Sequence, residues 1–168
     1  MGRLTDSSVI AILTFLHIAS AIGWMGALIF FLSVVGPAVR TFSPGASLEF
    51  LTKVGPRQLR YFGGVATSTI IFGLALVFAA FGTDVSTWPG YIEVGMTLGL
   101  IAYLIAVLVT IPTFRKADKV AHAIMANPQG ANPAELVGLM KRANMAAMTI
   151  GVILFLTLVF MVSNAVFA

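Results

Sequence analysis

Two histidines are the residues best suited to chemistry in this chain, and their surroundings differ. His17 lies inside an apolar run that extends over residues 9–35, whereas His122 lies close to Asp118 and Lys119 in a polar stretch. Within hydrocarbon, an imidazole must find a polar partner or a ligand, because its ring nitrogens cannot be hydrated there. His17 is therefore the candidate functional residue, with a hydrogen bond to a neighbouring backbone carbonyl or serine as the alternative interpretation. His122 is expected to be a solvated surface residue.

Two methionines are expected at the depth of His17. His17 lies roughly 12 Å inside its apolar run, at about 1.5 Å per residue. Met96 lies near the start of a later apolar run, and Met161 lies a few residues before the end of the last one. Imidazole nitrogen with one or two thioether sulfurs suits Cu(I), because soft sulfur favours the softer ion. His17, Met96 and Met161 are the candidate copper ligands, and gap filling in an apolar core is the alternative role of the methionines.

Haem b is a second candidate cofactor, and the absence of any cofactor is the third interpretation. One histidine and one methionine are an ordinary pair of axial ligands for haem iron. A haem that lay deeper in the membrane would meet Arg57 and Arg60. The chain has no Cys, and its apolar runs contain no Ser/His/Asp set, phosphate-binding loop or paired carboxylates. Hydrolysis and phosphoryl transfer are therefore not expected, and an enzymatic role is the less favoured interpretation.

The composition places these residues in a membrane. The chain has 168 residues, of which 59% are hydrophobic and 10% are charged, and its mean hydropathy is +1.01. Soluble domains carry about 25% charged residues, which their water-facing surface requires. These values exclude a soluble domain, a disordered chain and a nucleic-acid-binding module. We expect a single membrane domain that comprises residues 1–168.

Four apolar runs are long enough to cross a bilayer as helices, which takes about 20 residues each. They extend over residues 9–35, 62–81, 91–111 and 143–162. The sequence therefore predicts an all-α polytopic membrane protein, an antiparallel bundle of four transmembrane helices. Small residues recur at Ala19, Gly23 and Ala27 and at Gly95 and Gly99, a spacing that allows helices to approach closely.

The basic residues predict the orientation of the bundle. All but one of the Lys and Arg residues lie in the stretches between the first and second runs and between the third and fourth runs. They are Arg40, Lys53, Arg57, Arg60, Arg115, Lys116, Lys119, Lys141 and Arg142. Because basic residues are retained in the cytoplasm, we expect a multi-pass plasma (inner) membrane protein with both termini outside. Anionic lipid head groups are the expected partners of the basic cytoplasmic rim, and nucleic acid is not expected to bind.

Proline and glycine divide the stretches between the runs. Gly36-Pro37 is expected to end or kink the first helix. Residues 46–54 are expected to form a separate amphipathic segment along the inner interface, bounded by Gly55-Pro56.

The third helix is expected to continue past Pro112 as part of a cytoplasmic helical hairpin, residues 113–142. Asn132 is typical of a helix N-cap, and Pro133 and Glu135 suit the first and third positions of the helix that follows.

The segment from Phe15 to Gly26 contains the pattern L-H-x6-W-x-G. It resembles the first helix of the CopD-like group of small bacterial membrane proteins, which includes copper-resistance D domains and, more distantly, HemJ-type protoporphyrinogen oxidases. The likeness extends through Gly36-Pro37-Ala38 and Arg60-Tyr61-Phe62. The resemblance implies that His17 ligates a metal ion or haem, and that Trp24 and Gly26 shape the helix interface around it.

Three functions are therefore open. The first is a copper-binding or copper-handling protein with an outer-leaflet site around His17. The second is a membrane redox subunit that binds b-type haem through the same residue. The third is a cofactor-free accessory or scaffold subunit of a larger membrane complex. Assembly as a homo-oligomer or within such a complex is compatible with each function.

Overall fold

The fold is seen in a computed structural model that describes the backbone of residues 2–130 and 132–167 and the side chains of residues 7–130 and 132–162. The described residues form helices and no strands. In chain order the elements are α1 (Gly2–Phe30), a π-helical turn η1 (Phe31–Val35), α2 (Gly36–Val39), α3 (Pro44–Phe81), a 3₁₀ turn η2 (Val85–Thr87), α4 (Gly90–Ile105), a second π-helical turn η3 (Ala106–Thr110), α5 (Ile111–Ala126) and α6 (Pro133–Phe167).

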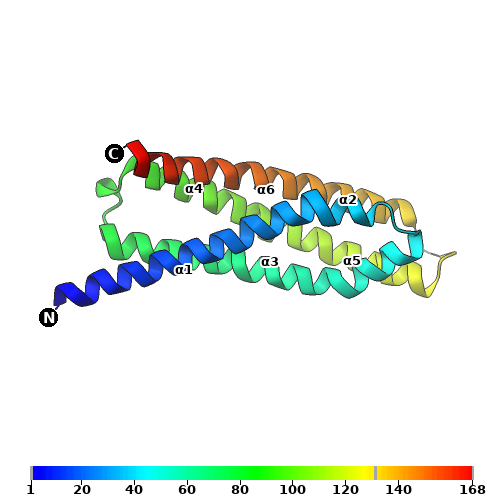
Figure 1. The fold of residues 1–168 in the computed structure, drawn as a ribbon. Coiled ribbons are helices and arrows are strands. Elements are labelled where there is room, and N and C mark those ends of the chain that lie inside the picture. The colour runs from blue at the N-terminus through cyan, green and yellow to red at the C-terminus, as the bar shows by residue number, and fades with distance from the viewer. Residues whose placement is uncertain (1, 131, 168) are drawn as a thin grey trace.

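These elements make four long rods, each antiparallel to the one before it in the chain (Figure 1). Within the described residues, four helical stretches are long and apolar enough to cross a membrane: Ser7–Val39, Pro44–Phe81, Gly90–Ala126 and Pro133–Val162. The predicted all-α bundle of four spanning helices is thus confirmed. We call the end that carries both chain ends and the α3–α4 connection the terminal end, and the opposite end the basic end.

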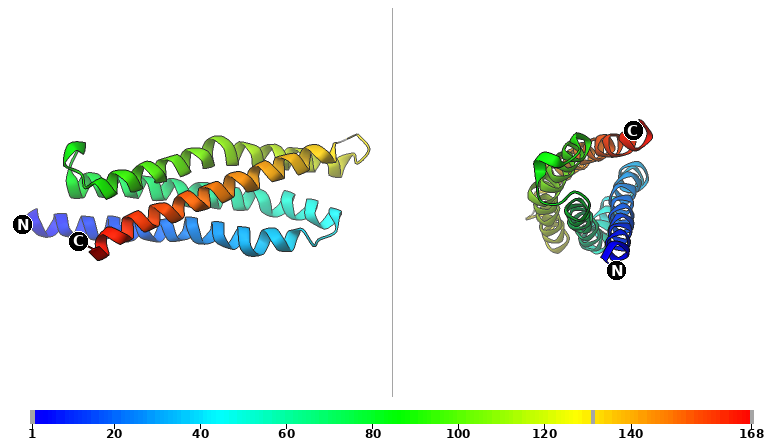
Figure 2. Two further views of the ribbon diagram at one scale, coloured as in Figure 1. Left: turned by 90° about the horizontal axis from the view of Figure 1, so that it is seen from above. Right: turned by 90° about the vertical axis from the view of Figure 1, so that its left-hand side faces the viewer.

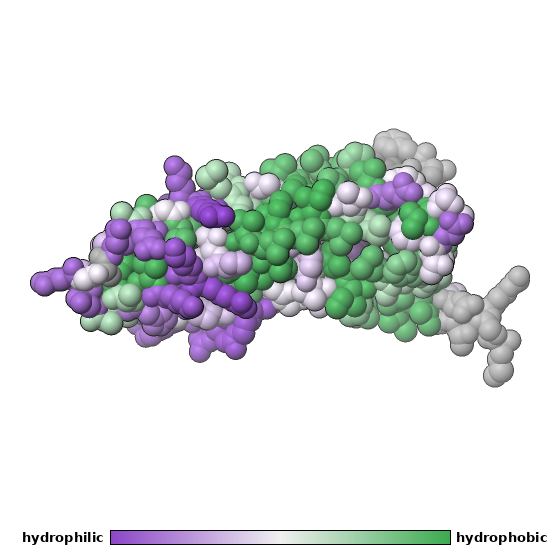
Figure 3. Space-filling view, turned by 180° about the vertical axis from the view of Figure 1, so that it is seen from behind, coloured by the Kyte–Doolittle hydropathy of each residue, from purple (hydrophilic) through white to green (hydrophobic). Residues whose placement is uncertain are grey.

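The surface of the bundle fits a multi-pass membrane protein. Large apolar side chains on its outside are widely exposed, as at Phe15 (70%) and Leu108 (67%). On the face seen in Figure 3, a broad band of hydrophobic side chains crosses the middle, and hydrophilic side chains gather mainly at the basic end. So large an exposed apolar surface is unfavourable in water, whereas lipid tails solvate it well.

The four rods pack as two tight pairs. The helix α1 packs along α3, α4 packs along α6, and α5 contacts both α3 and α6 (Figure 2). A small residue allows the first pair to approach closely: a Cβ added at Gly23 would lie 3.5 Å from the Tyr61 hydroxyl oxygen and 3.5 Å from Val65 Cγ1. This contact agrees with the packing role expected for Gly23 from the spacing of small residues. The core where the pairs meet includes Trp24 and Ala102.

Of the prolines inside the rods, Pro37 and Pro112 each lie just after a π-helical turn. The Gly36 N–H bonds to the Phe31 carbonyl before Pro37, and the Ile111 N–H bonds to the Ala106 carbonyl before Pro112. A proline in a regular α-helix clashes with the carbonyl four residues earlier, and the wider turn moves this carbonyl aside. The first rod therefore continues through Pro37 to the end of α2, so Gly36-Pro37 does not end the helix.

The expectation of a separate amphipathic segment over residues 46–54 is wrong. These residues are the first turns of α3, which continues through Pro56 without a break. The residue before a proline normally avoids the α conformation, because its Cβ meets the proline ring. Gly55 has no Cβ, so the helix passes through this position. Ser43 caps the helix by accepting a hydrogen bond of 3.4 Å from the Ala46 N–H.

The helical hairpin at the basic end agrees with the sequence prediction. The third rod continues past Pro112 to the end of α5, and α6 begins at Pro133. Asn132 Oδ1 accepts a hydrogen bond of 3.0 Å from the Ala134 N–H, as expected of an N-cap. The Glu135 carboxylate pairs with Lys116 Nζ at 2.9 Å, which ties the start of α6 to α5.

The connection at the terminal end folds around Trp88. Its indole is 7% exposed, packs edge-on against Phe78 with ring centroids 5.8 Å apart, and donates a hydrogen bond of 3.2 Å to the Gly82 carbonyl. Asp84 Oδ1 accepts hydrogen bonds from the Ser86 hydroxyl and backbone N–H, which lower the pKa of this carboxyl. These bonds hold the short 3₁₀ turn η2 ahead of α4.

Candidate functional site

The two helix pairs separate toward the terminal end and leave a cavity of about 580 Å³ between them. Side chains from α1, α3, α4 and α6 line it, and they include four residues singled out from the sequence: His17, Trp24, Met96 and Met161. Their shared cavity agrees with the depths counted from the ends of the apolar runs.

The His17 ring is oriented by the backbone of α3. Its Nδ1 lies 2.9 Å from the Thr69 carbonyl oxygen. A carbonyl oxygen can only accept, so Nδ1 carries the proton of the neutral ring and Nε2 keeps its lone pair. No described residue forms a hydrogen bond with Nε2. The hydrogen bond to a backbone carbonyl, the alternative interpretation of His17, is thus present, and Nε2 has no partner among the described residues.

A glycine makes room for this ring. A Cβ added at Gly73 would lie 2.8 Å from His17 Cε1 and 2.9 Å from Nδ1, closer than real atoms approach. Any side chain at position 73 would therefore displace the imidazole or push α1 away from α3. Gly73 lies one helical turn after Thr69, so one face of α3 provides both the recess and the hydrogen-bond acceptor.

A second glycine makes room for Met161. A Cβ added at Gly95 would lie 2.5 Å from Met161 Cε and 3.0 Å from its Cγ. The thioether of α6 thus lies directly against the backbone of α4. Gly99 also lines the cavity, but a Cβ added there would meet nothing within 4 Å. The pair Gly95 and Gly99, predicted as a packing row, packs at the first position and opens the cavity at the second.

The side chains of the cavity wall are apolar apart from His17, the indole N–H of Trp24 and three threonines. Thr14, Thr69 and Thr157 each donate a hydroxyl hydrogen bond to the carbonyl four residues earlier, at 2.8, 2.8 and 2.9 Å. Their hydroxyl protons are therefore already used. His17 Nε2, in contrast, has no hydrogen-bond partner among the described residues.

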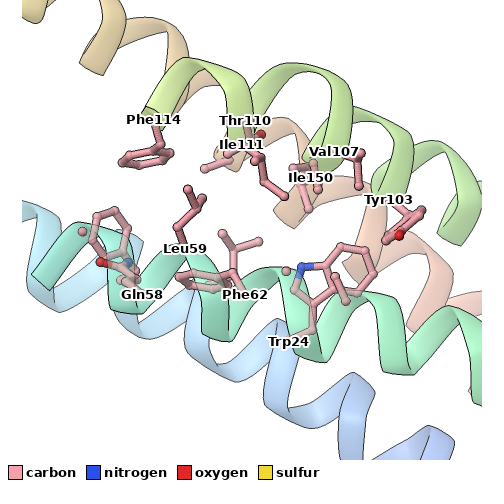
Figure 4. Close-up of a pocket in the computed structure, with 17 residues that line it drawn as sticks. Trp24, Gln58, Leu59, Phe62, Tyr103, Val107, Thr110, Ile111, Phe114 and Ile150 are labelled. Atoms are coloured by element: carbon pink, nitrogen blue, oxygen red, sulfur yellow. The ribbon is translucent and has the colours of Figure 1, made fainter. Parts of the chain in front are cut away.

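Trp24 separates this cavity from a second, smaller one. The indole is 3% exposed and lines both the large cavity and a cavity of about 60 Å³ toward the basic end. Figure 4 shows Trp24 and Phe62 on one side of this smaller cavity, with Ile111 and Phe114 on the other. Tyr103 also lines the smaller cavity. Its hydroxyl oxygen lies 3.1 Å from that of Thr67, and the two groups share one of the interhelical hydrogen bonds expected of these residues.

The structure does not bring Gly26 into the site. Gly26 is exposed on α1, and a Cβ added there would meet nothing within 4 Å. Ser20 lies one turn from His17 but bonds to the Leu16 and His17 carbonyls of its own helix. His122 lies on the exposed side of α5, where Nδ1 bonds to the Asp118 carbonyl at 2.9 Å, in line with its expected surface role.

Sequence reasoning missed Gly73 and the Thr69 carbonyl, and a signal for Gly73 was present. In antiparallel helices, residues equally far from the same membrane surface lie at one level. Gly73 lies as far before Phe81 as His17 lies after Val9. Gly73 has no polar or sulfur-containing side chain, so matching such side chains by depth does not reveal it.

Comparisons with models of protein families, with curated proteins and with solved structures find no match to this chain. The interpretation of the site therefore rests on its residues and their geometry.

Proposed function

We propose that this chain is a CopD-like integral membrane protein that binds or handles copper in the cavity beside His17. The observation that carries the proposal is the orientation of the imidazole, with Nδ1–H on the Thr69 carbonyl and Nε2 left available. Metal-binding histidines commonly hold their second ring nitrogen in this way, because the bond fixes the tautomer and the ring angle. The L-H-x6-W-x-G pattern supports the same assignment for His17.

The donor atoms around the cavity fit a soft cation. His17 would supply nitrogen, and Met96 and Met161 would supply thioether sulfur from α4 and α6. Within the part of the chain that the structure describes, no three His, Cys, Asp or Glu side chains gather as a metal-binding group. A hard cation that needs several carboxylates would find no such set, whereas Cu(I) accepts few and soft ligands. Bound copper would supply a soft cation for transfer or a one-electron centre.

The remaining cavity residues would control access to His17. The threonine hydroxyls are satisfied within their own helices and the other walls are apolar, so water gains little by entering. Trp24 blocks the direction toward the basic end. An ion that reached His17 would therefore exchange more easily with the terminal end than with the basic end.

Haem b is the second candidate, and the size of the cavity favours it. A volume of about 580 Å³ is far larger than one metal ion needs, and pockets of about 300–1,000 Å³ hold small organic ligands. His17 would again be the axial ligand. However, no Lys or Arg side chain among the described residues lines the cavity, so the propionates would have to reach the membrane surface.

The test is elemental analysis together with an absorption spectrum of the purified full chain after reconstitution with copper or haem. We expect one copper per chain, with loss of the metal in His17→Ala and retention in His122→Ala. The second variant is a matched control, because His122 lies on the exposed surface of α5. A Soret band that is present in the wild type and in His122→Ala but absent in His17→Ala would identify the cofactor as haem instead of copper. Neither cofactor in the wild-type chain, or full retention in His17→Ala, would overturn the proposal.

The methionines are tested separately with leucine, which nearly conserves side-chain volume. Met96→Leu and Met161→Leu should each weaken copper binding while the helical content stays unchanged. Met148→Leu is the control, because Met148 is exposed on the outside of α6. Equal copper affinity in all three variants would show that neither Met96 nor Met161 is a ligand, with His17 as the remaining candidate.

A further inference from the structure

A groove at the basic end lies between α3 and α5, on the far side of Trp24 from the His17 cavity. It has a volume of about 350 Å³, with an apolar wall that includes Leu59, Ile111 and Phe114. Two guanidinium groups, those of Arg60 and Arg115, stand at the same groove. The groove thus presents a hydrocarbon surface and two positive charges to one ligand.

Consecutive glycines keep this groove open. A Cβ added at Gly64 would meet nothing within 4 Å, and one added at Gly63 would lie 3.7 Å from its nearest neighbour, Ile111 Cδ1. Both glycines line the groove. The hollow therefore arises from missing side chains on α3 and not from a gap in the backbone.

The two arginines have no carboxylate partner in the described structure. The ion pairs of the described residues join Lys53 with Glu49, Lys116 with Glu135, and His122 with Asp118. Arg60 Nε–H donates to the Pro56 carbonyl at 3.3 Å, which leaves its terminal nitrogens available. Unpaired guanidinium groups at an apolar surface are unfavourable unless water or an anion satisfies their donors.

Asp118 also lines the groove and limits its positive charge. Its Oδ1 is buried without a hydrogen bond. This oxygen lies 3.4 Å from His122 Nδ1, but that nitrogen is bonded to the Asp118 carbonyl at 2.9 Å. With two guanidinium groups and one carboxylate, the groove suits a ligand with a single negative charge. A phosphodiester carries one such charge and accepts paired hydrogen bonds from guanidinium.

The position of the arginines relates the groove to the bilayer. Arg60 lies two residues before the apolar run 62–81, and Arg115 lies four residues after the apolar run 91–111. Because the two rods are antiparallel, both guanidinium groups lie at the edge of the apolar band, the level at which phospholipid head groups lie. A free phosphate would use the charges but leave the apolar wall uncovered.

We propose that this groove is a binding site for an anionic phospholipid, with the phosphodiester on Arg60 and Arg115 and one acyl chain along Leu59, Ile111 and Phe114. This goes beyond a diffuse attraction of the basic rim for the membrane, because it assigns one lipid to one site. It is independent of the copper proposal, since the groove and His17 lie at different ends of the bundle.

The test is native mass spectrometry of the full chain in detergent, titrated with phosphatidylglycerol or phosphatidylcholine. We expect one phosphatidylglycerol to bind in preference to phosphatidylcholine, and roughly tenfold or greater weakening in the double variant Arg60→Gln/Arg115→Gln. The double variant Lys141→Gln/Arg142→Gln removes the same charge from α6 and should bind like the wild type. Circular dichroism checks that each variant is folded.

A second variant tests the groove without changing its charge. Gly64→Leu fills open space and should weaken phosphatidylglycerol binding as strongly as the double arginine variant. Three results would each overturn the proposed lipid site. They are equally weakened phosphatidylglycerol binding in the Lys141→Gln/Arg142→Gln control, equal affinity for phosphatidylcholine and phosphatidylglycerol, and unchanged phosphatidylglycerol binding in Gly64→Leu. Displacement of the lipid by inorganic phosphate at millimolar concentration would show that the site takes the phosphate alone.

Discussion

At the scale of single residues, the sequence predicts one part of the site, the His17 side chain. It does not predict the two groups that position this side chain, the Thr69 carbonyl and Gly73. His17 could be found because a titratable group inside an apolar run is unusual. The Thr69 carbonyl could not be found, since every residue has a carbonyl and only the register of α1 against α3 selects this one. The role of Gly73 likewise depends on which side chain lies against it.

Gly73→Ala should displace His17. The added Cβ would lie 2.8 Å from Cε1, so the ring must rotate away from the Thr69 carbonyl or the helices must separate. Loss of such an orienting bond typically weakens metal binding by roughly tenfold or more. Nitrogen NMR of ¹⁵N-histidine should show loss or a large shift of the His17 Nδ1–H signal. The chain has two histidines, so His122 serves as an internal reference.

The control for this variant is Gly99→Ala, which adds the same methyl group to the same cavity without a clash. It should leave the His17 signal and any cofactor affinity unchanged. An unshifted His17 signal in Gly73→Ala would show that the recess does not fix the ring.

At the scale of elements, hydropathy located all four spanning helices, while their ends were less predictable. The apolar runs predict where lipid surrounds a helix, but α3 starts 18 residues before its run begins, because its polar first turns still pack and hydrogen-bond as a helix. Proline usually marks a helix boundary, as predicted here at positions 37 and 56. Gly55 and the π-helical turn η1 remove the clash that makes it one.

The start of α6 provides a prediction for one element. Asn132→Ala removes the acceptor of the Ala134 N–H and should destabilise the protein by about 1 kcal/mol, the usual cost of a lost N-cap. Hydrogen exchange at the first amides of α6 should accelerate, and the thermal midpoint should fall slightly. Gln129→Ala, an exposed change in the same connection, should alter neither quantity. Unchanged exchange in Asn132→Ala would contradict the capping role.

At the scale of the whole molecule, the cavity could be anticipated only in part. Depth counting placed His17, Met96 and Met161 at one level, but a level does not reveal whether the helices there touch or separate. The cavity exists because α1 packs on α3 and α4 packs on α6, with looser contact between the pairs. Such pairing depends on contacts distributed over entire helices, which local sequence patterns do not encode.

The distribution of charge predicts how the whole bundle is inserted. Because the chain has no Cys, single cysteines can be introduced at Thr83, in the terminal-end connection, and at Gln129, in the basic-end connection. Both residues are exposed. If the basic end is retained in the cytoplasm, a membrane-impermeant maleimide applied to intact cells should label Thr83→Cys, and Gln129→Cys only after the membrane is broken. The reverse pattern would place the His17 cavity in the inner leaflet.

The π-helical turn η3 also affects how the chain tolerates changes in length. A hydrogen bond that spans five residues holds one residue more than a regular turn, so η3 is equivalent to a single-residue insertion. In a regular helix, deletion of one residue rotates everything after it by about 100°. Deletion of one residue within 106–110, together with replacement of Pro112, would instead restore a regular helix. The side chains of α5 would then keep their orientation toward α3 and α6. A deletion just after Arg142 in α6, which has no such turn among its described residues, would rotate Lys141 and Arg142 by the same angle relative to the rest of that helix.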